Sequence, residues 1–365
     1  MGTEKIPIYK PYIGEDENKI VAECMQSTWI SSQGKYIPTF EENVQDYIGA
    51  DHAIAVSNGT VAIHLAMLAL DIGPGDEVIT PNFTYVASSN SILYVGATPI
   101  FVDIDPLSWN LDPSLIEEKI SPRTKAILYT NVYGTPAEYK ELKRVADKHG
   151  LYLIEDAAES FGATYGQKMS GTLGDISTYS FFGNKTITTG EGGMVLTPHK
   201  EMADKIRKLK NQGNSDTVRY YHDVLGYNYR MTNIQAAIGV AQLGKIDNIL
   251  DLKRKLQHNY EVGLKDLVRF QRLPDNATSS YWMCSILFKS TTEKLQVLNA
   301  LNKANVETRP FFTPIDELPF YKKAEDCPNA KEVSAKGMNL PSFPALKKNE
   351  QDRIIEIIRN NIVRL

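Results

Sequence analysis

The stretch DISTYSFFGNKTITTGEGGMVL, residues 175–196, places two short runs of β-branched, aromatic and apolar residues on either side of a loop. Short runs of this kind, bounded by glycine, are typical of strands. The loop between them carries Lys185 among aromatic, small and glycine residues, whereas most lysines lie on charged, solvated surfaces. The stretch therefore predicts two strands of one sheet with a lysine held in the loop that joins them.

Similar runs precede this stretch from about residue 50 onward: HAIAVS, DEVITP, TPIFVDI, KAILYTNV and LYLIEDA. Segments with helical periodicity separate them, and we expect helices to begin near Thr60, Tyr85, Pro113 and Pro136. This alternation predicts an α/β fold with a mainly parallel, seven-stranded sheet between helices. In such folds the site lies in the loops at the carboxyl ends of the strands.

The second half of the chain has a different pattern. MTNIQAAIGVAQLGKIDNILDLKRKLQHNYEVGLKD, residues 231–266, repeats apolar residues at helical spacing and predicts one long helix leaving the large domain. SSYWMCSILFK, EKLQVLNALNKANV and NEQDRIIEIIRNNIVRL then predict a smaller α+β unit. We expect a large domain over residues 1–245 and a small C-terminal domain over residues 246–365.

Composition excludes several classes of function. With 42% hydrophobic residues, 23% charged residues and a net charge of −4, the chain can bury a substantial core and has no basic field for nucleic acid. No apolar run is long enough for a membrane span, and no signal peptide is evident, so we expect a cytoplasmic protein. Cys24, Cys284 and Cys327 lack metal-site spacing and are expected to be reduced packing thiols, with no metal bound.

Three short motifs carry candidate chemistry, and each has a plainer interpretation. Gly59 and Thr60 open a helix directly after the run IAVS, which suits a phosphate but is also usual for a helix cap. Asp156 ends the run LYLIEDA, with Glu159 about one turn beyond. A carboxylate there can hold a protonated ring nitrogen, although strand-end aspartates often cap helices.

The third motif is the loop of residues 175–196. A desolvated Lys185 can form a Schiff base with an aldehyde, and Ser180 can bind a phosphate, although a solvated lysine is the commoner case. The turn TGEGG lacks the G-x-G-x-x-G spacing and precedes a strand rather than a helix. We therefore exclude a dinucleotide-binding dehydrogenase.

In this order, the motifs resemble those of fold type I pyridoxal-phosphate (PLP) enzymes and, more narrowly, of the DegT/DnrJ/EryC1/StrS sugar aminotransferases. The resemblance covers nearly the whole chain. Its segments, each weak but together specific, are STWISSQGKYIPTFEE, VSNGTVAIHLA, PNFTYVAS, VDIDPLSWNLD, IEDAAES, SFFGNKTITTGEGGM, GYNYRMTNIQAAIG, SYWMCSIL and TRPFF.

The resemblance implies PLP as cofactor, with pyridoxamine phosphate as its intermediate form. It implies Lys185 as the lysine that binds the cofactor, Asp156 opposite the pyridine nitrogen, and Glu159 near the phenolic oxygen, where many members have glutamine. Tyr85 would stack on the ring, and Asn228 would reach the phosphate from the neighbouring subunit, which implies a homodimer with shared sites. The remaining cofactor residues that it implies hold the phosphate: Gly59, Thr60 and Ser180.

Within the family, the chain looks most like perosamine-type members, which aminate C4 of a GDP-linked 4-keto-6-deoxymannose with L-glutamate as donor. Such members usually have Tyr-Pro-x-His after the TRPFF-like stretch, where this chain has Thr-Pro-Ile-Asp at residues 313–316. We expect Asn184, Arg309 and Asp316 to contact the substrate.

Three alternatives stay open. A viosamine-type enzyme would aminate a UDP- or dTDP-linked 4-keto-6-deoxyglucose. A PLP-dependent sugar dehydratase usually has histidine in place of Lys185. A non-enzymatic regulator on this scaffold would need an additional partner-binding segment.

Overall fold

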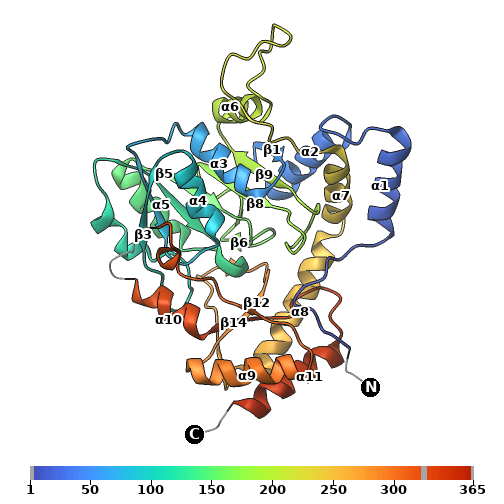
Figure 1. The fold of residues 1–365 in the computed structure, drawn as a ribbon, viewed down its shortest axis with the longest axis vertical. Coiled ribbons are helices and arrows are strands. Elements are labelled where there is room, and N and C mark those ends of the chain that lie inside the picture. Colours follow the sequence, from blue (N-terminus) through green and yellow to red (C-terminus); the bar gives the residue numbers. More distant parts are fainter. Residues whose placement is uncertain (1–3, 322–326, 363–365) are drawn as a thin grey trace.

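The computed structural model describes residues 4–321 and 327–362, and its larger part is a central sheet with helices on both faces (Figure 1). The sheet has the order β1-β9-β8-β5-β4-β2-β3. β9 runs antiparallel to both neighbours, and the other adjacent pairs are parallel. The predicted α/β class and mainly parallel sheet are confirmed. The strands are β1 (His52–Val56), β2 (Glu77–Pro81), β3 (Thr98–Val102), β4 (Thr124–Thr130), β5 (Tyr152–Asp156), β8 (Ile176–Ser180) and β9 (Gly193–Thr197).

Alternating side chains of β1 show how the sheet is covered. Ala53 and Ala55 pack in a cluster with α1, α2 and α7, whereas Ile54 and Val56 pack in a cluster with α3 and α6 on the other face. α5 covers the first of these faces further along the sheet. The helices of this part are α1 (Glu15–Ser27), α2 (Tyr36–Ile48), α3 (Gly59–Ala69), α4 (Val86–Tyr94), α5 (Tyr139–His149), α6 (Lys200–Lys210) and α7 (Asn233–Leu243).

The helix expected near Pro113 is wrong. Only two short 3₁₀ turns form there, Pro113–Leu115 and Glu117–Lys119, and Ile120 is already extended. The sequence continues with Ser121 and a proline, and a residue before proline is disfavoured in the helical region. The helix expected near Pro136 begins a little later, at Tyr139.

The single long helix expected over residues 231–266 is also wrong, because the chain breaks between α7 and α8 (Ile246–Leu264). Gly244 ends the first helix, Lys245 leaves the helical region, and glycine favours such a break. α7 lies close against α2, since a Cβ on Gly239 would come within 2.6 Å of the Phe40 ring. α8 turns away toward the C-terminal part (Figure 1).

The C-terminal part contains a second sheet of order β10-β12-β14-β13, with α8, α9 and α11 packed around a separate hydrophobic cluster. Residues before α1 join it, because Ile6 pairs with Val306. This agrees with the expected α+β character, while the domain boundary near residue 245 stays a prediction. Its elements are β10 (Arg269–Phe270), β12 (Cys284–Leu287), α9 (Thr291–Lys303), β13 (Arg309–Pro310), the 3₁₀ turn Ile315–Glu317, α10 (Pro328–Lys336), β14 (Gly337–Leu340) and α11 (Lys348–Asn361).

A small third sheet ties the two parts together. β11 (Ala277–Thr278) pairs with β6 (Thr164–Tyr165), which pairs with β7 (Lys168–Met169). The three cysteines are buried free thiols, as expected. Within the two described ranges, no helix has the length and apolar character that crossing a membrane would require.

Candidate active site

A cavity of about 540 Å³ opens where β5 and β8 end and α3 begins. Residues from the C-terminal part, among them Trp282 and Phe312, complete its wall. The predicted site residues that line it are Gly59, Thr60, Tyr85, Asp156, Glu159, Ser180, Asn184, Lys185 and Arg309. The fold thus brings most of the predicted residues to one cavity, and the role of each stays a prediction.

The start of α3 forms one end of the cavity. Asn58 caps this helix by accepting a hydrogen bond from the Val61 N–H at 3.0 Å. A Cβ on Gly59 would lie 2.7 Å from the Ser180 Cβ, so glycine is what lets the helix start approach that hydroxyl. Free N–H groups at a helix N-terminus beside a hydroxyl suit a phosphate.

Asp156 is the last residue of β5 and is 3% exposed. Its carboxylate accepts hydrogen bonds from the Ser88 hydroxyl at 2.5 Å and from the Ala158 N–H at 3.1 Å. Burial raises the pKa of Asp156, and the hydrogen bond from Ser88 opposes this effect. A buried carboxylate facing a cavity is stabilised as the anion when a cation binds beside it.

The Lys185 amine lies 3.8 Å from a carboxylate oxygen of Glu159; the Glu159 side chain is buried, and the Lys185 side chain is 12% exposed. Burial lowers the pKa of Lys185, although the charges of Glu159 and Asp156 oppose this. Burial also raises the pKa of Glu159 to about 7, against the charge of Lys185 and a hydrogen bond from the Tyr133 N–H. A lysine whose pKa is lowered has more of the neutral, nucleophilic amine at neutral pH.

Two residues that sequence reasoning did not assign hold the lysine in place. The Lys185 Nζ lies 4.0 Å from the centre of the Trp282 ring, and the Trp282 indole N–H donates to the Asn184 carbonyl at 2.6 Å. The Tyr9 hydroxyl donates to the Lys185 carbonyl at 2.7 Å. Trp282 lies within the segment SYWMCSIL, but no local spacing links it or Tyr9 to residues so distant in the chain.

Tyr85 precedes α4 and is 55% exposed, with its ring 5.9 Å from that of Phe312. It lines the cavity and is too exposed to be a core aromatic. Arg309, in β13, and Asn184 line the same cavity.

Asp316 lies apart from the cavity lining, in a buried position. Its carboxylate accepts a hydrogen bond from the Asn82 side-chain amide at 2.6 Å, and its N–H donates to the Asn82 amide oxygen at 3.0 Å. The Lys331 amine lies 3.8 Å from the other carboxylate oxygen. These contacts tie the 3₁₀ turn to the end of β2, so the expected substrate contact gains no support.

Asn228 also lies outside the lining of this cavity; it is exposed and pairs with Asn211, directly after α6. Its side-chain oxygen accepts a hydrogen bond from Arg230 at 3.1 Å. The expected contact with a neighbouring subunit stays a prediction.

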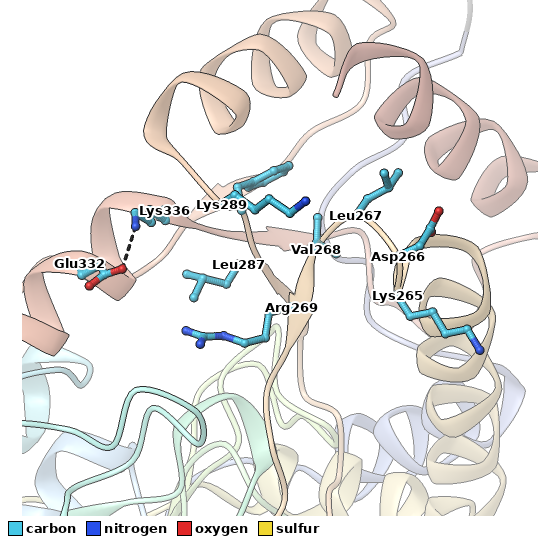
Figure 2. A pocket seen from close by; sticks show the side chains of 10 residues that line it. Lys265, Asp266, Leu267, Val268, Arg269, Leu287, Lys289, Glu332 and Lys336 are labelled. Carbon is cyan, nitrogen blue, oxygen red and sulfur yellow. Dashed lines mark hydrogen bonds and ion pairs between the residues drawn. The ribbon is translucent and has the colours of Figure 1, made fainter. Parts of the chain in front are cut away.

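A second cavity, of about 330 Å³, is lined by charged side chains that do not point toward a common centre (Figure 2). Lys265, Arg269 and Lys289 line it but extend in different directions, and Lys336 pairs with Glu332 at 2.7 Å on one α10 face. Solvated cations of this kind are ordinary surface charges. The cavity that contains Lys185 is the candidate active site.

Comparison with known proteins identifies the family of the chain. Residues 11–359 match the sequence profile of the DegT/DnrJ/EryC1/StrS aminotransferase family. The chain is 47% identical to GDP-perosamine synthase of Escherichia coli O157:H7 over 97% of both chains. It is 44% identical to GDP-perosamine synthase of Vibrio cholerae, over 97% of this chain and 98% of that one.

Solved structures give the same result. Spr1654 from Streptococcus pneumoniae, in its PMP form, superposes with a TM-score of 0.94 at 27% identity, over 98% of this chain and 97% of that one. Its PLP form also gives a TM-score of 0.94, at 26% identity, over 99% of this chain and 100% of that one.

Proposed function

Because this chain belongs to the DegT/DnrJ/EryC1/StrS aminotransferase family, we propose that it transfers an amino group from L-glutamate to C4 of a GDP-linked 4-keto-6-deoxyhexose. The chain is a PLP-dependent sugar aminotransferase. The observation that carries the proposal is the convergence of one largely enclosed amine, Lys185, and two buried carboxylates, Asp156 and Glu159, on a cavity beside a helix N-terminus.

The described residues fit PLP. The start of α3 and the Ser180 hydroxyl would hold its phosphate, Asp156 its protonated ring nitrogen and Lys185 its aldehyde carbon. When bound, PLP supplies an electron sink that stabilises negative charge at the carbon losing a proton. The negative charge of Asp156 favours the protonated ring, because a neighbouring anion stabilises a cation in a buried site.

The chain's own groups move the proton. Lys185 can take up a proton at its Nζ and return it, because burial lowers its pKa from the ordinary lysine value. Glu159 has a pKa of about 7 and lies 3.8 Å from that amine, so it can exchange a proton with it. The indole ring of Trp282 lies 4.0 Å from this amine and holds it in place.

The substrate assignment is supported by the similarity to GDP-perosamine synthases and by the cavity. Arg309 lines the cavity, and its guanidinium suits a diphosphate. Asp316, which would have placed an anion near that diphosphate, is instead held by Asn82. The departure at residues 313–316 therefore gives no reason to prefer a UDP- or dTDP-linked sugar.

We propose a homodimer in which Asn228 of each subunit reaches the other's phosphate site, since this side chain is exposed and does not line its own cavity. Mixing the Lys185→Ala and Asn228→Ala subunits tests it, because a mixed dimer would keep one intact site. The cysteines are free, which is usual in a reducing compartment, and we propose the cytoplasm as location.

Parallel assays with GDP-, UDP- and dTDP-linked 4-keto-6-deoxy sugars test the reaction. The enzyme, PLP and L-glutamate should yield a 4-amino product fastest from the GDP-linked sugar, with 2-oxoglutarate formed in equal amount. Product NMR with nitrogen at C3 would overturn the regiochemistry. Deoxygenation without amination would indicate the dehydratase, and turnover of UDP- or dTDP-linked sugars alone would reassign the nucleotide.

A further inference from the structure

The turn before β12 forms part of the wall behind Lys185. The Ser280 hydroxyl donates a hydrogen bond to the Glu159 carbonyl at 3.0 Å, and the Trp282 indole N–H donates to the Asn184 carbonyl at 2.6 Å. Trp282 also places its ring 4.0 Å from the Lys185 amine. The C-terminal part thus contacts the backbone on both sides of the reacting amine through one turn.

Lys253, on α8, holds this turn from behind. Its side chain is buried, and its amine donates to the carbonyls of Tyr281 at 3.2 Å, Trp282 at 3.1 Å and Ser342 at 2.9 Å. An ammonium group has three donors, which match these three acceptors. The ring of Tyr9, whose hydroxyl bonds to the Lys185 carbonyl, lies 5.4 Å from the same amine.

Burying this amine is costly. Its described contacts are carbonyls and a ring rather than a carboxylate, and burial lowers the pKa of Lys253 to about 8. An aliphatic side chain would avoid that cost but would leave three carbonyls without donors. Tyr281 also has a φ of 48°, in the left-handed region that non-glycine residues disfavour. The amine therefore stabilises a strained turn.

We propose that Lys253 is a positioning residue: it fixes the turn that carries Trp282, and Trp282 holds the Lys185 amine against its ring. This inference deepens the proposed function and rests on it for the role of Lys185. A cation over an indole face is stabilised, so Trp282 favours the protonated form of Lys185. The charged groups that face Lys185 from other elements are Asp156, Glu159 and Arg309, and the test leaves them unchanged.

Lys253→Met and Trp282→Leu test the proposal, with Lys294→Met as the matched control. Lys294, on α9, also donates to two backbone carbonyls, those of Ser334 at 3.2 Å and Ala335 at 2.9 Å, but does not line the cavity. Competitive acetylation of the cofactor-free protein across pH, read on the Lys185 peptide by mass spectrometry, gives the pKa of that amine without any sugar substrate.

We expect the Lys185 midpoint to fall by about one pH unit in Trp282→Leu, to fall in Lys253→Met as well, and to stay unchanged in Lys294→Met. In the holoenzyme, kcat should fall about tenfold in the first two variants with a smaller change in KM. Because acetylation needs no turnover, failure of the proposed reaction leaves this readout intact.

A folded Lys253→Met protein with the wild-type midpoint and kcat overturns the proposal. An equal shift in Lys294→Met also overturns it, because the effect would then reflect general loosening. If Lys253→Met does not fold, Lys253→Gln, which keeps amide donors, takes its place and should shift the midpoint less than Trp282→Leu. The proposal is rejected if the Lys253→Gln variant and the Trp282→Leu variant both keep the wild-type midpoint of Lys185.

Discussion

The two faces of β5 carry adjacent carboxylates in opposite circumstances. Glu155 and Asp156 are both buried, and they point to opposite sides because side chains alternate along a strand. Asp156 accepts two hydrogen bonds and lines the cavity. Glu155 lies away from that cavity, and its donors are the Asn131 amide, the Ser170 and Ser177 hydroxyls and the N–H groups of Gly171 and Leu173.

The difference separates structure from function by hydrogen-bond capacity. A carboxylate has room for about four acceptor contacts, so Glu155 is saturated by the protein. Asp156 keeps capacity on the side of the cavity, where a ligand can use it. Both positions hold a buried carboxylate. What distinguishes the binding group, Asp156, is its remaining capacity to accept hydrogen bonds.

The largest effect should come from the amine that faces Asp156 across the cavity. We expect Lys185→Ala to abolish turnover while the protein stays folded, because no other amine lines the described cavity. Borohydride reduction of the wild-type protein with PLP, followed by peptide mapping, should place the label on Lys185. Label on another lysine would contradict the assignment, and Lys294→Met serves as the active control.

Next, Asp156→Asn should lower kcat about a hundredfold or more, since the amide no longer favours a protonated ring nitrogen. The variant keeps the size of the side chain: its amide oxygen can accept from the Ala158 N–H, and its NH₂ group can donate to the Ser88 hydroxyl, which can also act as an acceptor. Its unfolding free energy should therefore change by only about 1 kcal/mol. Urea unfolding and steady-state kinetics on one preparation measure both. Near-normal kcat would remove Asp156 from the mechanism.

The same exchange on the other face should do the reverse. Glu155→Gln replaces an acceptor oxygen by an N–H₂ group that confronts hydroxyl and N–H donors. At least one buried donor then loses its partner, which costs about 2–3 kcal/mol of unfolding free energy. In the variant that remains folded, kcat should stay within about threefold of wild type. A large loss of kcat at unchanged stability would refute the distinction between the two faces.

Sequence could predict the binding face better than the structural one. Lys185, Asp156 and the start of α3 belong to motifs whose order along the chain is recognisable. The alternating apolar runs predicted the α/β fold class. Glu155 gave no signal, because its donors come from loops that only the folded chain brings together. The role of Trp282 beside Lys185 could not be predicted for the same reason. The break at Gly244 was missed because apolar periodicity continues across it.

The smallest effect concerns Glu159. The protein neither surrounds this buried carboxylate with donors, as it does Glu155, nor fully neutralises its charge. It accepts from the Tyr133 N–H and lies near Lys185, and burial raises its pKa to about 7. The folded protein therefore holds this proton more tightly than the unfolded chain does. Stability of the cofactor-free protein is then favoured at low pH and falls as pH rises from about 4.5 to about 7, by roughly 2 kcal/mol between pH 5 and pH 7.

Glu159→Gln removes this titration while keeping an acceptor for Tyr133, so it should gain stability over wild type as pH rises through that window. Urea unfolding of both cofactor-free proteins at pH 5, 6 and 7 measures the difference, and Glu155→Gln is the matched control on the opposite face. A constant difference at all three pH values would show that Glu159 keeps an ordinary pKa. In that case the charge of Lys185 satisfies Glu159 as completely as five donors satisfy Glu155. The remaining capacity of a buried carboxylate would then have to be counted in ion pairs as well as in hydrogen bonds.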